Sequence, residues 1–214
     1  RASANGYSPA DYEVIPNGVL IPPEADPAGR EDRILFVGRQ EARKGLSILL
    51  RAWPEIRRRT GATLRVIGAD PLAVRLLMAK LRTPSDGIEI LGFLPQERLT
   101  EELLGAKAMA APSLGGESFG MVLTRAFACA TPVVASDIEG YREVMTSDAG
   151  ISVPAGDPVA LADAMTRLLA DEQARCQAGL AARHLAEERY SWDGIAKRLA
   201  GVYEQALGRV PVAA

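Results

Sequence analysis

The residues best suited to chemistry in this sequence are a glycine pair, an acid and a serine at residues 115–118. Gly115 and Gly116 permit backbone angles closed to other residues and let a ligand approach the main chain. Ser118 is a candidate cap for the helical pattern that follows, where unpaired N–H groups of a first turn attract an anion. The Glu117 carboxylate could accept hydrogen bonds from vicinal hydroxyl groups, so the pattern indicates a phosphate-bearing sugar as ligand. In the alternative interpretation, Glu117 only complements the helix dipole at a strand–turn–helix junction.

Two cations form a second candidate site. The chain reads Gly38-Arg39 after an apolar run that ends at Val37, and Lys44-Gly45 opens the next helical pattern. A guanidinium makes forked, two-point contacts with a phosphate, and an ammonium adds a compact charge. Taken alone, these residues would be interpreted as solvated loop cations. The glycine pair after another apolar run favours a shared phosphate site.

Apolar runs alternate with longer amphipathic stretches along the chain. The expected strands are residues 34–37, 63–67, 88–91, 108–111, 132–135 and 150–153. The clearest helical patterns are residues 46–59, 72–81, 120–129, 159–169 and 192–207. Strict alternation predicts an α/β, Rossmann-like domain whose parallel sheet is covered by helices on both faces. Ligands of such sheets bind at the carboxyl ends of strands, where the strand order reverses.

Composition agrees with one domain. The chain has 214 residues, 48% of them apolar, which suffices for a single core. We expect a linker or arm at residues 1–33, a ligand-binding domain at residues 34–190, and a C-terminal helix and tail at residues 191–214. The formal charge of −2 gives no general attraction to nucleic acid, so no nucleic-acid partner is expected. Cys129 and Cys176 match no metal-ligand spacing and suit reduced thiols in the cytoplasm, and no membrane-spanning run appears in the sequence.

Two longer stretches carry a family resemblance: G-G-E-S-F-G-M-V-L at residues 115–123, and A-F-A-C-A-T-P-V-V-A-S-D-I-E-G at residues 126–140. They resemble the donor-site signature of retaining, family 4 glycosyltransferases, and are most similar to the phosphatidylinositol mannosyltransferase group of actinobacteria. The similarity begins at residues 14–19, includes F-V-G-R-Q-E-A-R-K-G at residues 36–45 and closes with Y-S-W at residues 190–192. It implies the GT-B fold, in which two Rossmann-like domains face each other. This chain is similar to the C-terminal, nucleotide-sugar-binding half.

The resemblance implies a role for individual positions. Arg39 and Lys44 match the residues that grip the donor diphosphate, and Glu117 matches the acid that holds the donor sugar hydroxyls. The other matched positions are expected to contact or flank the sugar, phosphates, ribose or base: Gly38, Leu94, Ser118, Phe119, Gly120, Val122, Leu123 and Arg125. Of these, Leu94 would fit a core leucine equally well.

Two positions depart from the family pattern. The family usually has a second glutamate eight residues after the first, which accepts hydrogen bonds from the ribose hydroxyls; this chain has Arg125, which cannot accept one. Arg125 would then contact the diphosphate, turn outward or leave a weakened site. Ala130 stands where the family often has glycine, and it is strained if the position requires a left-handed backbone.

The resemblance implies transfer of a hexosyl group from a nucleoside diphosphate sugar, with retention at the anomeric carbon and no required cofactor or metal. In the family, the acceptor site and usually a catalytic histidine belong to the N-terminal domain, and His184 here matches no catalytic motif. We therefore expect a C-terminal half that lacks its acceptor domain, binds donor and turns it over inefficiently.

The donor expected from the resemblance is guanosine diphosphate mannose, although uridine diphosphate sugars suit the same motifs. The acceptor would be a lipid or a small molecule. The resemblance also implies a cytoplasmic location. We further expect the missing half to contact the inner face of the membrane.

Three other classes compete with this interpretation. A dinucleotide-dependent oxidoreductase would share the architecture, but no G-x-G-x-x-G follows the first apolar run. A non-catalytic nucleotide-sugar-binding or regulatory module would explain Arg125. A plain interaction domain would bind no nucleotide.

Overall fold

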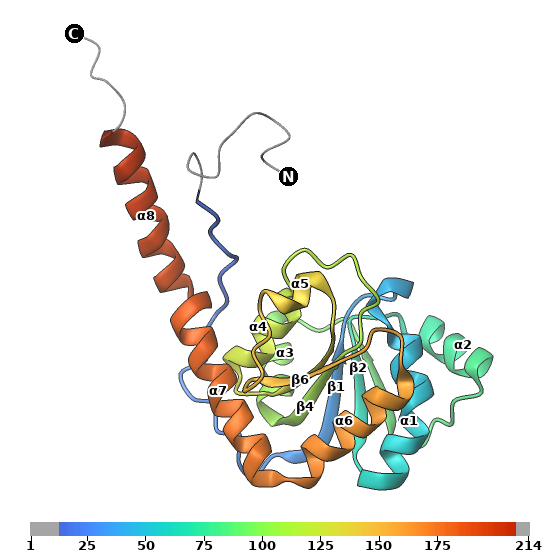
Figure 1. Ribbon diagram of the computed structural model, residues 1–214. Coiled ribbons are helices and arrows are strands. Elements are labelled where there is room, and N and C mark those ends of the chain that lie inside the picture. The colour runs from blue at the N-terminus through green and yellow to red at the C-terminus, as the bar shows by residue number, and fades with distance from the viewer. Residues whose placement is uncertain (1–12, 209–214) are drawn as a thin grey trace.

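The computed structural model of the chain describes residues 13–208. Within that range, six parallel strands form one sheet in the order β3-β2-β1-β4-β5-β6. The sheet lies between layers of helices (Figure 1). The strands are β1 (Glu31–Val37), β2 (Thr63–Ile67), β3 (Ile88–Gly92), β4 (Ala106–Ala111), β5 (Val133–Ser136) and β6 (Gly150–Val153). The predicted parallel sheet is confirmed. Its strand order reverses between β1 and β4, so the crevice expected to bind a ligand lies at their carboxyl ends.

Helices cover both faces of this sheet. They are α1 (Leu46–Thr60), α2 (Pro71–Leu81), α3 (Gln96–Gly105), α4 (Met121–Ala128), α5 (Glu139–Arg142), α6 (Pro158–Ala170), α7 (Glu172–Tyr190) and α8 (Trp192–Gly208). Buried side chains of α1, α2 and α6 pack on one face, and those of α3, α4, α5 and α7 pack on the other. The strands are buried on both sides, as a parallel sheet requires.

Aspartate caps determine where three of these helices begin. Asp70, Asp157 and Asp171 each accept hydrogen bonds from first-turn N–H groups of α2, α6 and α7, respectively. A proline follows two of these caps, at Pro71 and Pro158, where the missing N–H costs nothing and the fixed φ suits a helix. Both helices consequently begin one residue before the predicted positions.

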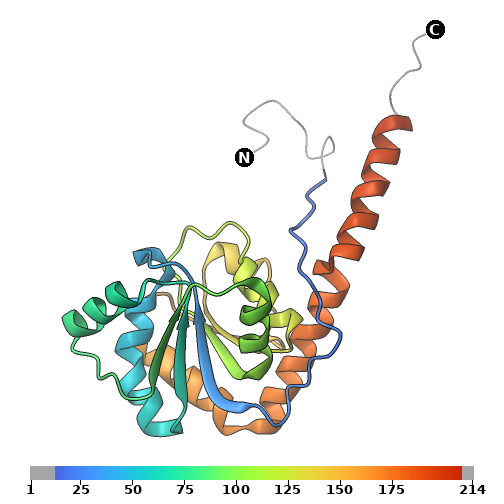
Figure 2. The ribbon, with the colours of Figure 1, turned by 180° about the vertical axis from the view of Figure 1, so that it is seen from behind.

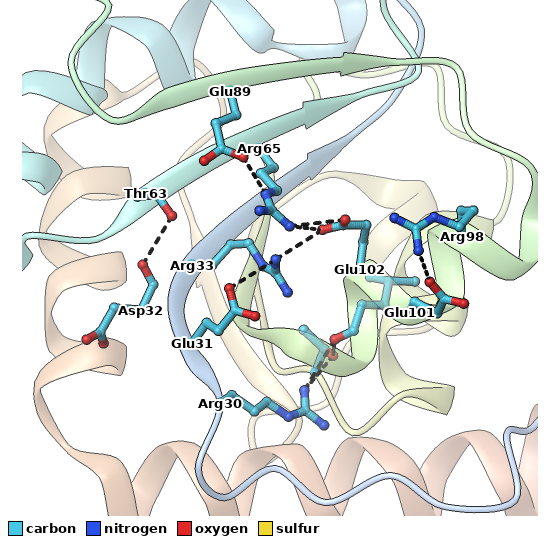
Figure 3. A network of polar contacts seen from close by, with 12 residues as sticks. Arg30, Glu31, Asp32, Arg33, Thr63, Arg65, Glu89, Arg98, Glu101 and Glu102 are labelled. Atoms are coloured by element: carbon cyan, nitrogen blue, oxygen red, sulfur yellow. Dashed lines mark hydrogen bonds and ion pairs between the residues drawn. The ribbon is translucent and has the colours of Figure 1, made fainter.

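A charged network lies between the sheet and α3, near the amino ends of the strands (Figure 3). The Glu102 carboxylate, nearly buried, accepts hydrogen bonds of 2.8 and 3.1 Å from Arg65 and lies 3.4 Å from Arg33. Glu89 and Glu31 hold the outer sides of these two guanidiniums. Because each buried charge has an opposite partner, the network fastens α3 to the sheet at the edge opposite the expected crevice.

Main-chain carbonyls of the segment before β1 are held by guanidinium groups of α7. Arg183 donates to the carbonyl oxygens of Pro22 (2.7 Å) and Ala128 (2.6 Å), and the fully buried Arg175 donates to that of Pro27 (2.9 Å). Part of the predicted linker is therefore anchored to the domain.

The segment before β1 runs beside the junction of α7 and α8. The Val19 N–H donates to the Tyr190 carbonyl oxygen (2.6 Å), and α8 extends away from the sheet beyond this contact (Figures 1 and 2). Residues 1–12 of the predicted linker and residues 209–214 of the predicted tail lie outside the described residues. No described helix combines the length and apolar character needed to cross a bilayer.

Candidate functional site

The two predicted loops meet at the crevice between β1 and β4. Gly45 has a left-handed backbone, with φ 71°, and a Cβ atom there would lie 1.8 Å from the Pro112 carbonyl oxygen. The Leu114 N–H donates to the Arg43 carbonyl oxygen across the same junction (2.7 Å). The approach of the loops thus depends on a glycine before α1, which lets the main chains touch.

Glu117 is the centre of the contacts at this junction. Its Oε1 atom accepts hydrogen bonds from Lys44 Nζ (2.6 Å), Ser113 Oγ (3.0 Å) and Arg43 Nη1 (3.2 Å). The carboxylate side chain is 9% exposed, so these charge-assisted contacts are largely shielded from water. Its second oxygen, Oε2, accepts no hydrogen bond from any residue between 13 and 208. Glu117 can therefore neutralise two cations through one oxygen and offer the other to a ligand.

Arg43, which was not among the predicted site residues, joins Lys44 at this carboxylate. Arg39, which was, lies mostly in solvent with a 71% exposed side chain, and its Nε is 3.0 Å from Glu41. Glu41 also binds Arg43 (2.7 Å), so one carboxylate links both guanidiniums. In the sequence, the position of Arg43 next to Lys44 was the feature that could have identified it as a site residue. A diphosphate role for Arg39 remains a prediction, which would require this side chain to swing inward.

The helix after the glycine pair begins later than predicted. Its N-cap is Gly120, in a left-handed conformation with φ 75°, and no side chain caps the helix. The prediction that Ser118 caps it is wrong, because the chain turns through Gly120 before the first helical residue. Within the described part of the chain, the N–H groups of residues 115–122 donate to no protein acceptor, which leaves them available to an anion.

A cleft of about 640 Å³ opens beside this loop. Its lining includes three glutamates and consists of Gly115, Gly116, Glu117, Ser118, Ile138, Glu139, Gly140 and Glu143. A second cleft of about 680 Å³ shares Ser118 and Glu143 and adds Phe119. The glycine-rich loop thus borders two spaces of ligand size.

The remaining predicted residues divide between the loop and the core. The Leu123 side chain is fully buried among core residues, and its expected role beside the phosphate and ribose remains a prediction. Leu94 and Val122 are half-buried and pack against the same core. Phe119 packs edge to face on Tyr190, with ring centroids 5.6 Å apart.

Gly38 and Arg125 complete the predicted set. The Gly38 N–H donates to the Ile67 carbonyl oxygen (2.9 Å), which fixes the end of β1 beside β2. Arg125 is half-buried on the last turn of α4, and no hydrogen bond or ion pair joins its guanidinium to another described residue. The ligand roles of Gly38, Leu94, Val122 and Arg125 remain predictions.

Tyr141 on α5 also belongs to this site, although no sequence motif singled it out. Its hydroxyl lies 2.9 Å from Ser113 Oγ, and the residue is 2% exposed. Burial raises the pKa of Tyr141 to about 12, and the nearby Glu117 charge acts in the same direction. The phenol is therefore protonated and able to donate a hydrogen bond at neutral pH.

Ala130 has the left-handed backbone that the family resemblance suggested, with φ 51°. It is fully buried after α4, where glycine would carry no steric penalty.

Comparison with known proteins assigns the chain to a family. The family described as Glycosyl transferases group 1 matches residues 31–171, more than half of the chain. The chain belongs to this family. This glycosyl transferase group 1 domain is similar to phosphatidyl-myo-inositol mannosyltransferase of Mycobacterium leprae, with 36% identity over 208 residues. The alignment covers 91% of this chain and 54% of the relative. The domain is 38% identical over 184 residues to D-inositol 3-phosphate glycosyltransferase of Xylanimonas cellulosilytica, covering 83% of this chain and 43% of the relative.

Among solved structures, sucrose-phosphate synthase from Thermosynechococcus elongatus is similar over 92% of this chain and 53% of its own, with 28% identity and a TM-score of 0.79. The predicted family and Rossmann-like GT-B type of domain are thereby confirmed. The glycosyl transferase group 1 chain spans about half the length of the curated relatives it matches.

Proposed function

We propose that this chain is the donor-binding half of a retaining glycosyltransferase that uses a nucleoside diphosphate sugar. The observation that carries the proposal is the meeting of Lys44, Arg43 and Glu117 at the crevice between β1 and β4, beside a loop with unpaired N–H groups. Cations and helix N-terminal N–H groups suit a diphosphate, and a carboxylate with a free oxygen suits sugar hydroxyls.

The same residues have a role in catalysis on this proposal. Negative charge grows on the diphosphate as the glycosidic bond weakens, and preorganised positive groups stabilise it in a site that shields them from water. Lys44 and Arg43 reach the Glu117 carboxylate before any ligand is bound, so the entering diphosphate would compete with Glu117 for them. Arg39 would contribute a further guanidinium after moving from Glu41. No added cofactor is needed to supply positive charge here.

The finer assignments rest on the names of relatives. Phosphatidyl-myo-inositol mannosyltransferase suggests a mannosyl donor, with guanosine diphosphate mannose as its common form, and an inositol lipid as acceptor. D-inositol 3-phosphate glycosyltransferase suggests a soluble inositol phosphate instead. Because the relatives are about twice as long as this chain, we assign acceptor binding, and any contact with a membrane, to a partner domain of the GT-B enzyme.

Arg125 favours one alternative function, a non-catalytic module that binds a nucleotide sugar through a degenerate site. A half-buried guanidinium that pairs with no carboxylate of residues 13–208 stands at the position from which a carboxylate would bind the ribose. Such a module would still bind the diphosphate and the sugar, but weakly.

Calorimetry of the 214-residue chain tests the proposed function. Guanosine diphosphate, guanosine diphosphate mannose, uridine diphosphate and uridine diphosphate glucose are titrated into the unaltered chain and into Lys44→Met. We expect binding of at least one sugar nucleotide, weakened at least tenfold by Lys44→Met and unchanged by the matched control Lys197→Met on exposed α8. Absence of binding to all four ligands at millimolar concentration would contradict the proposal.

A further inference from the structure

Three side chains form a directional chain of hydrogen bonds beneath the glycine-rich loop. Ser113 Oγ is 3.0 Å from Glu117 Oε1 and 2.9 Å from the Tyr141 hydroxyl. An ionised carboxylate only accepts, so the Ser113 proton points to Glu117. The Tyr141 hydroxyl must then donate to Ser113, which gives the order Tyr141, Ser113, Glu117.

The helix that carries the tyrosine is pressed against the loop. A Cβ atom at Gly140 would lie 1.9 Å from the Glu117 carbonyl oxygen, and one at Gly120 would lie 3.0 Å from the Tyr141 ring. The main chain of α5 thus contacts Glu117 at Gly140, and the Tyr141 side chain contacts Gly120, the N-cap of α4. The hydroxyl of Tyr141 is fixed by this packing and cannot follow Ser113 if Ser113 moves.

The partners of Glu117 differ in what a bound diphosphate would do to them. Lys44 and Arg43 are cations that phosphate oxygens attract, so their bonds to Oε1 weaken when a diphosphate enters. Ser113 is neutral and lies 1% exposed behind the carboxylate. It is the partner best placed to remain on Oε1 in the occupied site.

We propose that Tyr141 and Ser113 are positioning residues that hold Oε1 of Glu117, so that Oε2 meets a hydroxyl of the donor sugar. This inference rests on the proposed function and adds to it the element that orients the sugar-binding acid. The pair touches neither sugar nor phosphate; it acts only through Glu117. Removing either hydroxyl should therefore lower the contribution of the sugar to binding affinity and leave the affinity for the nucleoside diphosphate intact.

Titration of Tyr141→Phe tests this, because the change removes the hydroxyl and keeps the buried ring. The ligands are guanosine diphosphate, guanosine diphosphate mannose, uridine diphosphate and uridine diphosphate glucose. For whichever pair the unaltered chain binds, we expect affinity for the sugar nucleotide to fall about fivefold, with less than a twofold change for the diphosphate. Ser113→Ala should give the same pattern. Tyr203→Phe, the same change at an exposed position of α8, should alter neither affinity.

A coupling measurement separates positioning from a general structural effect. If Tyr141 acts through the Glu117 charge, the fivefold loss should nearly vanish when Tyr141→Phe is added to Glu117→Gln. Equal losses for diphosphate and sugar nucleotide, or a full loss retained in the Glu117→Gln background, would overturn the proposal. If the unaltered chain binds the diphosphate and gains nothing from the sugar, this inference fails while nucleotide binding stands. If it binds none of the four ligands, the proposed function fails as well.

Discussion

Replacing Glu117 with glutamine should lower the affinity of the site for the sugar nucleotide relative to its affinity for the nucleoside diphosphate. The substitution keeps the size of the side chain and one acceptor oxygen but removes the charge. A hydrogen bond to a charged acceptor contributes about 1.5–3 kcal/mol and a neutral one about 0.5–1.5 kcal/mol. The difference is about 1–1.5 kcal/mol for each sugar hydroxyl bound, or roughly a five- to tenfold loss of affinity for the sugar nucleotide.

The nucleoside diphosphate should respond in the opposite direction or not at all. In the unoccupied site, Oε1 of Glu117 holds Lys44 at 2.6 Å and Arg43 at 3.2 Å. A neutral glutamine holds both cations less tightly and repels a phosphate less, so the diphosphate loses a competitor. We expect its affinity in Glu117→Gln to be unchanged or higher.

The assay is calorimetric titration of both ligands, and the quantity that matters is the ratio of their affinities in each variant. A partly unfolded variant lowers both affinities alike, so the ratio reports on recognition and not on stability. Glu139→Gln is the matched control, because Glu139 lines the same cleft and binds neither cation. An equal loss for both ligands in Glu117→Gln would refute this reasoning and assign Glu117 a purely structural role.

Other predictions follow from single residues. Arg125→Glu should tighten binding of the nucleoside diphosphate about tenfold by calorimetry, since a carboxylate can accept from the ribose hydroxyls. A tenfold loss would instead identify Arg125 as a phosphate ligand. Burial raises the pKa of Cys129 to about 11 and that of Tyr141 to about 12, above their ordinary values of 9.0 and 10.0. In the folded state, both groups therefore stay protonated to higher pH than in the unfolded chain. Between pH 9 and 12 these two shifts should each lower the free energy of unfolding by roughly 3 kcal/mol, while the pKa of Arg30, which burial lowers to about 10, acts in the opposite direction above pH 10. The contribution of each group is the part of the pH-dependent fall, measured in urea, that disappears in Cys129→Ala or Tyr141→Phe. A variant that keeps the full pH dependence of the unaltered chain would contradict the shift it tests. Gly179→Ala should destabilise the fold by about 1–3 kcal/mol, because a Cβ there lies 2.5 Å from a main-chain carbonyl oxygen. Gly201→Ala, where a Cβ atom would meet no described residue within 4 Å, should stabilise α8 by up to about 1 kcal/mol; urea unfolding of both variants checks the difference in sign.

Sequence patterns predicted the sheet better than the ends of its elements. Six apolar runs gave six strands, because burial on both faces leaves a strong signal in each. β1 begins earlier than predicted, at Glu31, because partners hold its charged residues: Asp32 binds Lys107 (2.5 Å), and Arg33 lies between two carboxylates. Such pairing joins residues far apart in sequence and leaves no local pattern.

The candidate site shows a similar division. Lys44 and Glu117 could be predicted from residue type and loop position, and they lie in contact. Arg39 and Arg43 are both arginines of one loop, and only side-chain geometry separates the solvated one from the one at the carboxylate. Tyr141 could not be predicted, because its role depends on how α5 packs against the loop that contains Ser113 and Glu117, which lies more than 20 residues earlier in the sequence.

The contact between Lys44 and Glu117 also has a consequence for folding. The two residues are 73 positions apart and come from loops after β1 and β4, so no local segment of the chain can form it. Closing such a loop is entropically costly, and the contact forms only when the central strands pair. A refolding chain would therefore acquire ligand affinity only after β1 and β4 have paired. A ligand that recognises only the native state adds its binding free energy to global stability, about 2.7 kcal/mol at a hundred times its dissociation constant.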